Sequence, residues 1–166
     1  MFARANAYHS QIAYVTNDLQ RAMKIWDECH GVGSFYVFSN DMPGVECSPP
    51  FRMTVALANV GGVEIELIEP VADQAPLHAE GLPQNGGFAM RFHHVAMRIR
   101  GELQDFEAHM ASLDKTAHPV VWTGGMGEVM RYAYTDERAT LGHYVEHVWF
   151  DDAFHAQLAS AIPNWP

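Results

Sequence analysis

The sequence carries the same plan twice, and this internal repeat limits the folds that the chain can adopt. Each copy begins with a strand-like stretch that holds a polar residue, Gln11 in the first copy and His94 in the second, and continues into a helical pattern. Each copy then reaches a later strand-like stretch with a glutamate, Glu66 or Glu146. The two polar residues are 55 positions apart in the first copy and 52 in the second. If the copies pair, the four side chains converge.

Hydrophobic periodicity predicts the elements of each copy. The expected strands are 8–15, 34–39, 51–59 and 63–69 in the first copy and 91–99, 119–123, 129–135 and 143–150 in the second. A helix is expected in each copy after its first strand, with Asn17 as the N-cap of the first, and a short helix is expected at about 151–161. The segment 40–50 is expected to be a loop, and 71–90 a linker rich in Pro, Gly and Gln. The chain is therefore predicted to be one α+β domain over 1–166, made of two βαβββ modules at about 7–70 and 91–150.

The strand alternation places the four polar residues away from the faces that pack against the helices. In a strand, successive side chains point to opposite faces. Glu66 alternates with Ile65 and Leu67, and His94 alternates with Val95. A lone glutamate of a one-sided sheet usually lies on the solvated face. Four polar residues at matched positions of a repeat instead favour a shared site.

Composition excludes several partners. The net charge is −10, from ten Lys plus Arg against twenty Asp plus Glu, which leaves no basic surface for nucleic acid or anionic lipid. We expect no nucleic-acid partner and no membrane partner. Without a signal-like apolar segment or a membrane-spanning run, the chain is expected to be cytoplasmic.

These motifs resemble the vicinal oxygen chelate superfamily, which includes glyoxalase I, methylmalonyl-CoA epimerase, extradiol dioxygenases and the bleomycin-resistance proteins. The resemblance is carried by the stretches around the four polar residues: QIAYVTNDL from Gln11, EIELIEP from Glu64, HVAM from His94 and GHYVE from Gly142. It implies two βαβββ modules that form a curled mixed sheet around a cleft. It also implies a homodimer, with the site either within one chain or shared across the dimer.

The resemblance puts Gln11, Glu66, His94 and Glu146 in the family's four metal-ligand positions. The ligand set of imidazole, amide and carboxylates suits Zn²⁺, Co²⁺, Ni²⁺, Mn²⁺ or Fe²⁺, and the sequence does not choose among them. The implied activity is that of an isomerase, epimerase or lyase, which moves a proton next to a carbonyl of a small oxygenated substrate through a metal-stabilised enolate. Glu146 is expected to shuttle the proton, with Glu66 as its opposite partner.

Two further residues were considered for the pocket. His9 lies two positions before Gln11, so regular alternation would put it on the same face, as a pocket residue or a ligand; a surface or core role is the alternative. Tyr144, on the face of Glu146, would hydrogen-bond a substrate oxygen or form the cavity wall. His93, next to His94, is expected to face the other way and to be structural.

Two other functions stay open. One is a metal-free protein that sequesters a small molecule, as bleomycin-resistance proteins do, and the other is an iron-dependent dioxygenase. The ring-cleaving dioxygenases use two histidines and one glutamate, a set that Gln11 and Glu66 break. Glyoxalase I carries an arginine four residues after its first ligand, where this chain has Val15. Four other arginines could reach a cavity instead: Arg52, Arg91, Arg98 and Arg131. The substrate is not identified.

Overall fold

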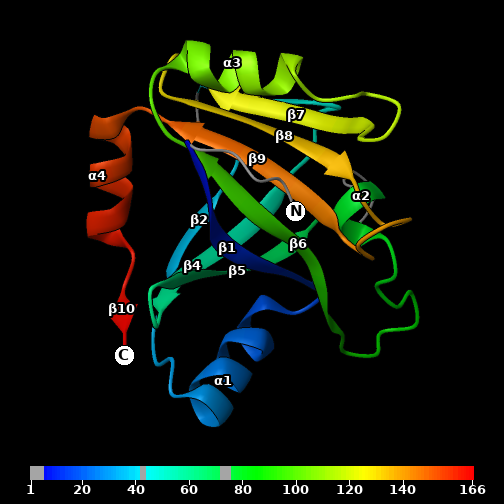
Figure 1. The fold of residues 1–166 in the computed structure, drawn as a ribbon. Coiled ribbons are helices and arrows are strands. Elements are labelled where there is room, and N and C mark those ends of the chain that lie inside the picture. The colour runs from blue at the N-terminus through cyan, green and yellow to red at the C-terminus, as the bar shows by residue number, and fades with distance from the viewer. Residues whose placement is uncertain (1–5, 42–43, 72–75) are drawn as a thin grey trace.

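The computed structural model describes residues 6–41, 44–71 and 76–166. In chain order the elements are β1 (Ala7–Thr16), α1 (Leu19–His30), β2 (Tyr36–Ser39), β3 (Val45–Ser48), β4 (Met53–Val60), β5 (Val63–Pro70), α2 (Pro76–Ala79), β6 (Met90–Ile99), α3 (Leu103–Ala111), β7 (Val120–Met126), β8 (Met130–Asp136), β9 (Tyr144–Phe150), α4 (Asp152–Ala161) and β10 (Asn164–Trp165) (Figure 1). Within the described ranges, no helix is long and apolar enough to cross a membrane.

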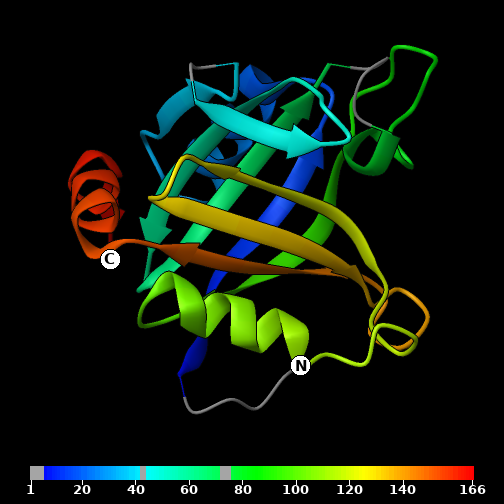
Figure 2. The same ribbon diagram turned by 90° about the horizontal axis from the view of Figure 1, so that it is seen from above.

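All the strands join one mixed sheet. Its order is β10-β4-β5-β1-β6-β9-β8-β7-β3, and β2 pairs with β4. At the centre, β1 and β6 are antiparallel, and each has a parallel neighbour on its outer side, β5 for β1 and β9 for β6. The two copies therefore meet along their first strands. Figure 2 shows the sheet curling round from β4 and β5 to β7 and β3. The predicted α+β class and curled mixed sheet are confirmed.

The helices α1 and α3 cover the outer, convex face of the sheet. Leu19 and Ala22 of α1 pack with Ala56, Ile65 and Leu67. On the second copy, Phe106 of α3 packs in a separate buried cluster with Met97, Val145 and Trp149. Burying a side chain of this size contributes about 1.5–3 kcal/mol, so each helix is held mainly by its apolar stripe.

The inner, concave face is aromatic. One buried cluster joins strands β6 to β9 with the segment before β4, and its members are Phe51, Ala96, Trp122, Tyr132, Tyr134, Tyr144 and Val148. Figure 1 places α2 at one end of the curled sheet. From α2, His78 reaches into this cluster, where its ring stacks on Phe51 with centroids 5.0 Å apart.

The glycine pair after β4 makes the turn of a hairpin between the expected strands 51–59 and 63–69. Gly61 and Gly62 have φ of 58° and 84°, the positive values that a tight two-residue turn requires and that glycine adopts without strain. Strands β4 and β5 pair from Val60 opposite Val63 to Met53 opposite Pro70. This hairpin orients β5, which carries Glu66.

Three details differ from the sequence predictions. The N-cap of α1 is Asp18, whose side chain accepts a hydrogen bond from the Arg21 amide at 2.9 Å, whereas the Asn17 side chain bonds the backbone of Gly87 and Ala89 near the end of the linker. The expected loop 40–50 contains β3, which pairs with β7 of the other copy. The linker contains α2, and a two-residue strand, β10, follows α4. These elements form through contacts with distant parts of the chain, which the local sequence pattern does not reveal.

Candidate functional site

The four predicted ligands come from four adjacent strands, β5, β1, β6 and β9. Gln11 and Glu146 both pair with Ala96, one from each side. In the next row, Glu66 and His94 both pair with Ala13. Directly paired residues point to the same face of a sheet. The site is thus two rows of polar side chains, each with a small buried alanine at its centre.

Three of the four side chains meet at one ring nitrogen. Nε2 of His94 lies 3.4 Å from Oε2 of Glu66 and 3.7 Å from Oε2 of Glu146. The His94 side chain is fully buried, and the two glutamate side chains are only 12% and 11% exposed. The Tyr134 hydroxyl lies 3.4 Å from the same nitrogen. The structure therefore brings the side chains of Glu66, His94 and Glu146 together.

Gln11 lies beside this group with its amide fixed. Its Nε2 donates a hydrogen bond of 2.7 Å to Oε1 of Glu64, which leaves its buried Oε1 without a partner. Oε2 of Glu66 is also buried and, despite its closeness to His94, is not aligned for a hydrogen bond. Buried acceptors are normally satisfied. These two oxygens are the ones that a cation would satisfy.

The pKa of the His94 imidazole depends on the two neighbouring carboxylates. Burial opposes the charged form of His94, but Glu146 and Glu66 outweigh it and raise the His94 pKa to about 9. Burial raises the pKa of Glu66. Burial and then the charge of Glu66 raise the pKa of Glu64 to about 7. The site therefore concentrates buried carboxylates that favour a positive partner.

The donor types fit a divalent ion, although the rotamers do not yet converge on it. Metal–ligand distances of about 2.1 Å separate neighbouring donors by roughly 3.4 Å in a tetrahedral site. The separation between His94 and Glu66 already suits this value. Nevertheless, no three His, Cys, Asp or Glu side chains among the described residues are arranged, as they stand, to hold a metal ion.

Two histidines near the site were not predicted to belong to it. A register shift between Ala13 and Tyr14 marks a β-bulge opposite His93, and the His93 ring packs with His94 and Tyr144 on the concave side. The expectation that His93 faces away is therefore wrong. Nδ1 of His93 lies 2.8 Å from Nδ1 of His94, a contact that orients the His94 ring and leaves its Nε2 towards the carboxylates.

His78 of α2 completes the wall of the site. Its ring stacks on His93 with centroids 4.6 Å apart, and it is almost fully buried. Burial, and then the nearby His94, lower the His78 pKa to about 3, so its ring is neutral near pH 7. The sequence signal for His93 was its place beside His94. His78 gave no signal, because it lies in a segment that reads as a linker.

The two predicted pocket residues lie on opposite faces of the sheet. A second register shift, between His9 and Gln11, pairs His9 with Met97, whose side chain packs in the cluster of α3. His9 is exposed on that convex side, so the expectation that it shares the face of Gln11 is wrong. Tyr144 lies in the concave aromatic cluster, but its hydroxyl donates to Oε2 of Glu80 at 3.1 Å. Burial and then Glu80 raise the Tyr144 pKa to about 12.

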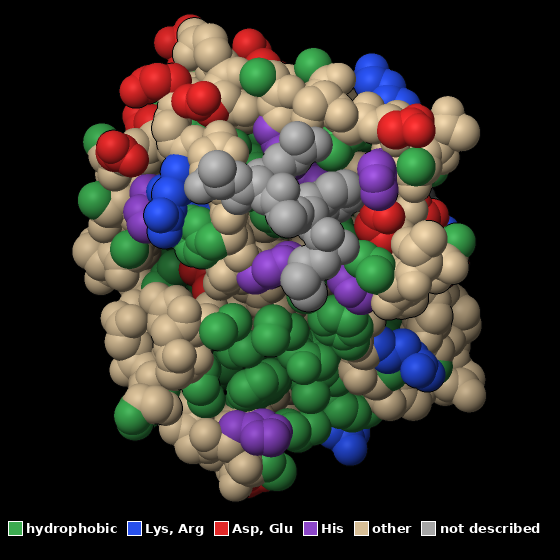
Figure 3. All heavy atoms as spheres, viewed as in Figure 1, with side chains coloured by type: hydrophobic (Ala, Val, Ile, Leu, Met, Phe, Trp, Pro, Cys, Tyr) green, Lys and Arg blue, Asp and Glu red, His purple; other side chains and the backbone are tan. Residues whose placement is uncertain are grey.

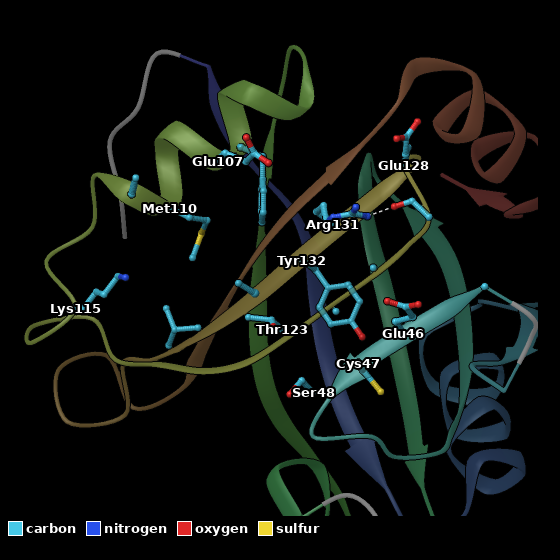
Figure 4. A pocket seen from close by; sticks show the side chains of 18 residues that line it. Glu46, Cys47, Ser48, Glu107, Met110, Lys115, Thr123, Glu128, Arg131 and Tyr132 are labelled. Atoms are coloured by element: carbon cyan, nitrogen blue, oxygen red, sulfur yellow. Dashed lines mark hydrogen bonds between the residues drawn. The ribbon is translucent and has the colours of Figure 1, made fainter.

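A broad groove of 1080 Å³ lies outside this site, between β3, β7, β8 and α3 (Figure 4). None of the four predicted ligands is among the residues that line it. The Arg131 guanidinium in the groove bonds the carbonyl oxygens of Gly127 and Met130. The predicted ligands therefore lie on the concave face, apart from this groove.

Comparisons with known proteins agree with the fold. The sequence model of the Glyoxalase/Bleomycin resistance protein/Dioxygenase superfamily matches residues 10–134. A solved structure of methylmalonyl-CoA epimerase in complex with methylmalonyl-CoA and NH4+ is 19% identical, with a TM-score of 0.61 over 89% of this chain and 97% of that one. Methylmalonyl-CoA epimerase from Mycobacterium tuberculosis is 16% identical, with a TM-score of 0.59 over 94% and 97%. No curated protein matches the sequence.

Proposed function

Because the chain belongs to the glyoxalase/bleomycin resistance protein/dioxygenase superfamily, we propose that it is a divalent-metal-dependent enzyme that transfers a proton next to a carbonyl group. Its reaction class is that of an isomerase, an epimerase or a lyase. The observation that carries the proposal is the convergence of Glu66 and Glu146 on Nε2 of His94 beside a buried aromatic cluster. Buried carboxylates beside an imidazole are costly for stability and are typical of functional sites.

Four residues would hold the ion. His94 offers Nε2, Gln11 offers the Oε1 that has no other partner, and Glu66 and Glu146 offer carboxylate oxygens. A bound divalent ion would supply Lewis acidity, stabilising the negative charge that develops on the substrate oxygen. Zn²⁺, Co²⁺, Ni²⁺, Mn²⁺ and Fe²⁺ all accept such a donor set.

Glu146 is the proposed base. Its Oε2 takes the proton from the carbon next to the carbonyl and returns it, to the same face or to another position. Tyr134 pairs with Glu146 across β8 and β9, and its hydroxyl near His94 can donate to a substrate oxygen. Glu66, on the opposite side of His94, is the second carboxylate. The aromatic cluster keeps water from the reacting carbon.

The proposed substrate is a small oxygenated carbonyl compound. The methylmalonyl-CoA epimerases of similar fold bind coenzyme A esters, as one complex contains methylmalonyl-CoA. This chain has a net charge of −10, which does not favour the diphosphate of coenzyme A. The same chemistry on a smaller molecule without a diphosphate avoids this repulsion.

Proton exchange with solvent tests the proposal. In D₂O, metal-loaded protein should exchange the proton next to the carbonyl of 2-hydroxycarbonyl compounds, as followed by NMR. Glu146→Gln should slow the exchange by about 10²-fold or more, since a positioned base contributes about that much. Glu107→Gln, a change on α3, is the matched control and should leave the rate unchanged. Equal rates for wild type and Glu146→Gln would contradict the assignment.

A second candidate function is metal-free binding of a small molecule. One observation favours it: a charged His94 between two carboxylates already compensates them without an ion. The aromatic cluster around Trp122 and Tyr134 would then enclose the ligand. A protein of this kind would bind small aromatic compounds equally well with and without chelator, and would exchange no protons.

A further inference from the structure

Arg98 is a buried cation that forms no salt bridge among the described residues, and the carboxyl group whose charge acts on it is that of Glu64. It lies on β6, only 8% exposed, and its guanidinium lies over the Phe150 ring at 5.4 Å. Its Nε has no hydrogen-bond partner, and within 6–41, 44–71 and 76–166 the Glu64 carboxyl acts on its guanidinium only through space, without a salt bridge. A buried charge without a salt bridge costs several kcal/mol. Such a residue is expected where a bound ligand supplies the ion pair.

Arg98 lines a small cavity of its own. The cavity has a volume of 140 Å³ and lies between the concave face of the sheet and α4. On the sheet side it is bounded by Ser10 and Glu64, and on the helix side by His155 and Leu158. It therefore offers one cation, a few hydrogen-bonding groups and an apolar wall. A carboxylate with a short alkyl stem is complementary to these surfaces.

We propose that this cavity binds the carboxylate of a small organic acid through the Arg98 guanidinium. The planar guanidinium donates two parallel hydrogen bonds to a carboxylate. Glu64 in the same cavity disfavours a doubly charged phosphate, which would face one cation and a nearby carboxyl group. The volume excludes a nucleotide or a coenzyme A chain.

The cavity adjoins the proposed metal site, and this part of the inference rests on the proposed function. Glu64 lines the cavity and accepts the hydrogen bond from Gln11. Arg98 is two residues along β6 from Ala96, the residue that Gln11 and Glu146 flank. Two residues of a strand span about 7 Å. The substrate would thus carry a carboxylate a few bonds away from its reacting carbonyl.

The binding test uses chelator-treated full-length protein, so that a metal ion cannot hold the acid. Propanoate is titrated by calorimetry, with propanamide and inorganic phosphate as comparison probes. We expect saturable propanoate binding with a Kd of about 1–10 mM, the weak range of a fragment-sized acid, and no binding of propanamide. The Arg98 Nε–H signal should shift during the same titration in wild-type protein, which needs no variant.

Two variants assign the binding to Arg98. Arg98→Met, which keeps the length of the stem, should weaken propanoate binding at least about tenfold and melt no lower than wild type, because an unpaired buried charge is gone. Arg21→Met removes an arginine that likewise lies over an aromatic ring, that of Phe88, and should bind as wild type does. Should Arg98→Met not fold, the Nε–H titration decides.

Three outcomes would overturn the proposal: no saturable propanoate binding, equal binding by Arg98→Met, or binding of phosphate alone. A metal-loading arm separates this inference from the proposed function. If the acid binds but no metal does, the Arg98 cavity stands and the enzyme proposal fails. If metal binds but the acid does not, the Arg98 proposal fails and the metal-site proposal stands. With metal bound, acids that join a 2-hydroxycarbonyl unit to a carboxylate should bind at least about tenfold tighter than propanoate if one molecule spans both sites.

Discussion

Two alanines give the site its shape at the scale of single residues. Ala13 and Ala96 are buried at the centre of the two rows, where a larger side chain would occupy the space between the polar groups. In each row the two polar residues lie on the strands that flank the alanine, so their side chains can extend towards each other over its methyl group. Small residues at these positions therefore leave room between the proposed ligands.

Filling that space should remove metal binding without unfolding the protein. We predict that Ala96→Leu costs about 1–3 kcal/mol, as overpacking of a core does, and lowers metal content at least about tenfold. Ala56→Leu is the matched control, because Ala56 is equally buried but lies in the cluster of α1. It should lose similar stability and keep its metal. Equal metal content in the two variants, measured by elemental analysis, would refute this account of the alanines.

At the scale of elements, regular alternation is predictable from sequence and its interruptions are not. The faces of Glu66, Glu146 and His94 follow from period-two patterns, and the structure agrees. The two bulges in the β1–β6 pair interrupt the alternation of side chains between the two faces. As a result His9 lies on the convex face and His93 on the concave face. A bulge depends on the partner strand, so one strand's pattern does not reveal it. The same reason explains why β3, which pairs with the distant β7, reads as a loop.

The short helix α2 places His78 in a buried position among aromatic rings. Its burial makes the free energy of unfolding depend on pH. His78 has a folded-state pKa of about 3, lowered by burial and then by His94, against an ordinary value of 6.5. Below pH 6.5 the unfolded chain takes up a proton that the folded state does not, so stability falls as pH decreases towards 3. His78 should contribute about 1 kcal/mol of this loss per pH unit.

Replacing the imidazole by a benzene ring tests this prediction. His78→Phe keeps the stacking on Phe51 and His93 and removes a buried nitrogen that has no partner. Urea unfolding at pH 7 and pH 5 should show a smaller loss for His78→Phe than for wild type. His30→Phe, a change at an exposed histidine at the end of α1, should behave as wild type. Parallel curves for wild type and His78→Phe would show that His78 titrates normally.

At the scale of the whole molecule, the two copies form one continuous sheet, and its convex side is only partly covered. Hydrophobic side chains gather in the lower half of the face shown in Figure 3. Phe92, near the start of β6, is 46% exposed and contacts Tyr14. Such a patch is typical of a surface that another chain covers. The paired copies place all four proposed ligands in one chain, so we propose a homodimer in which each chain keeps its own site.

Light scattering after size exclusion measures this assembly. The expected mass is twice that of the 18.6 kDa chain. Phe92→Asp should shift the mass towards the monomer, because a carboxylate in an apolar interface is costly. Val37→Asp changes a valine that is 45% exposed on β2 and should leave the dimer intact. A wild-type mass of one chain at all concentrations would exclude the dimer.

The central claim is that Gln11, Glu66, His94 and Glu146 form one metal site, and metal stoichiometry tests it most directly. Untagged protein is analysed for elements as purified and after loading with Zn²⁺, Co²⁺, Ni²⁺, Mn²⁺ and anaerobic Fe²⁺. We predict about one ion per chain in wild type and loss of at least about nine tenths of it in Glu66→Gln plus Glu146→Gln, since each carboxylate is a ligand. No metal in the wild type under any of these conditions, or full metal content in the double variant, would contradict the account.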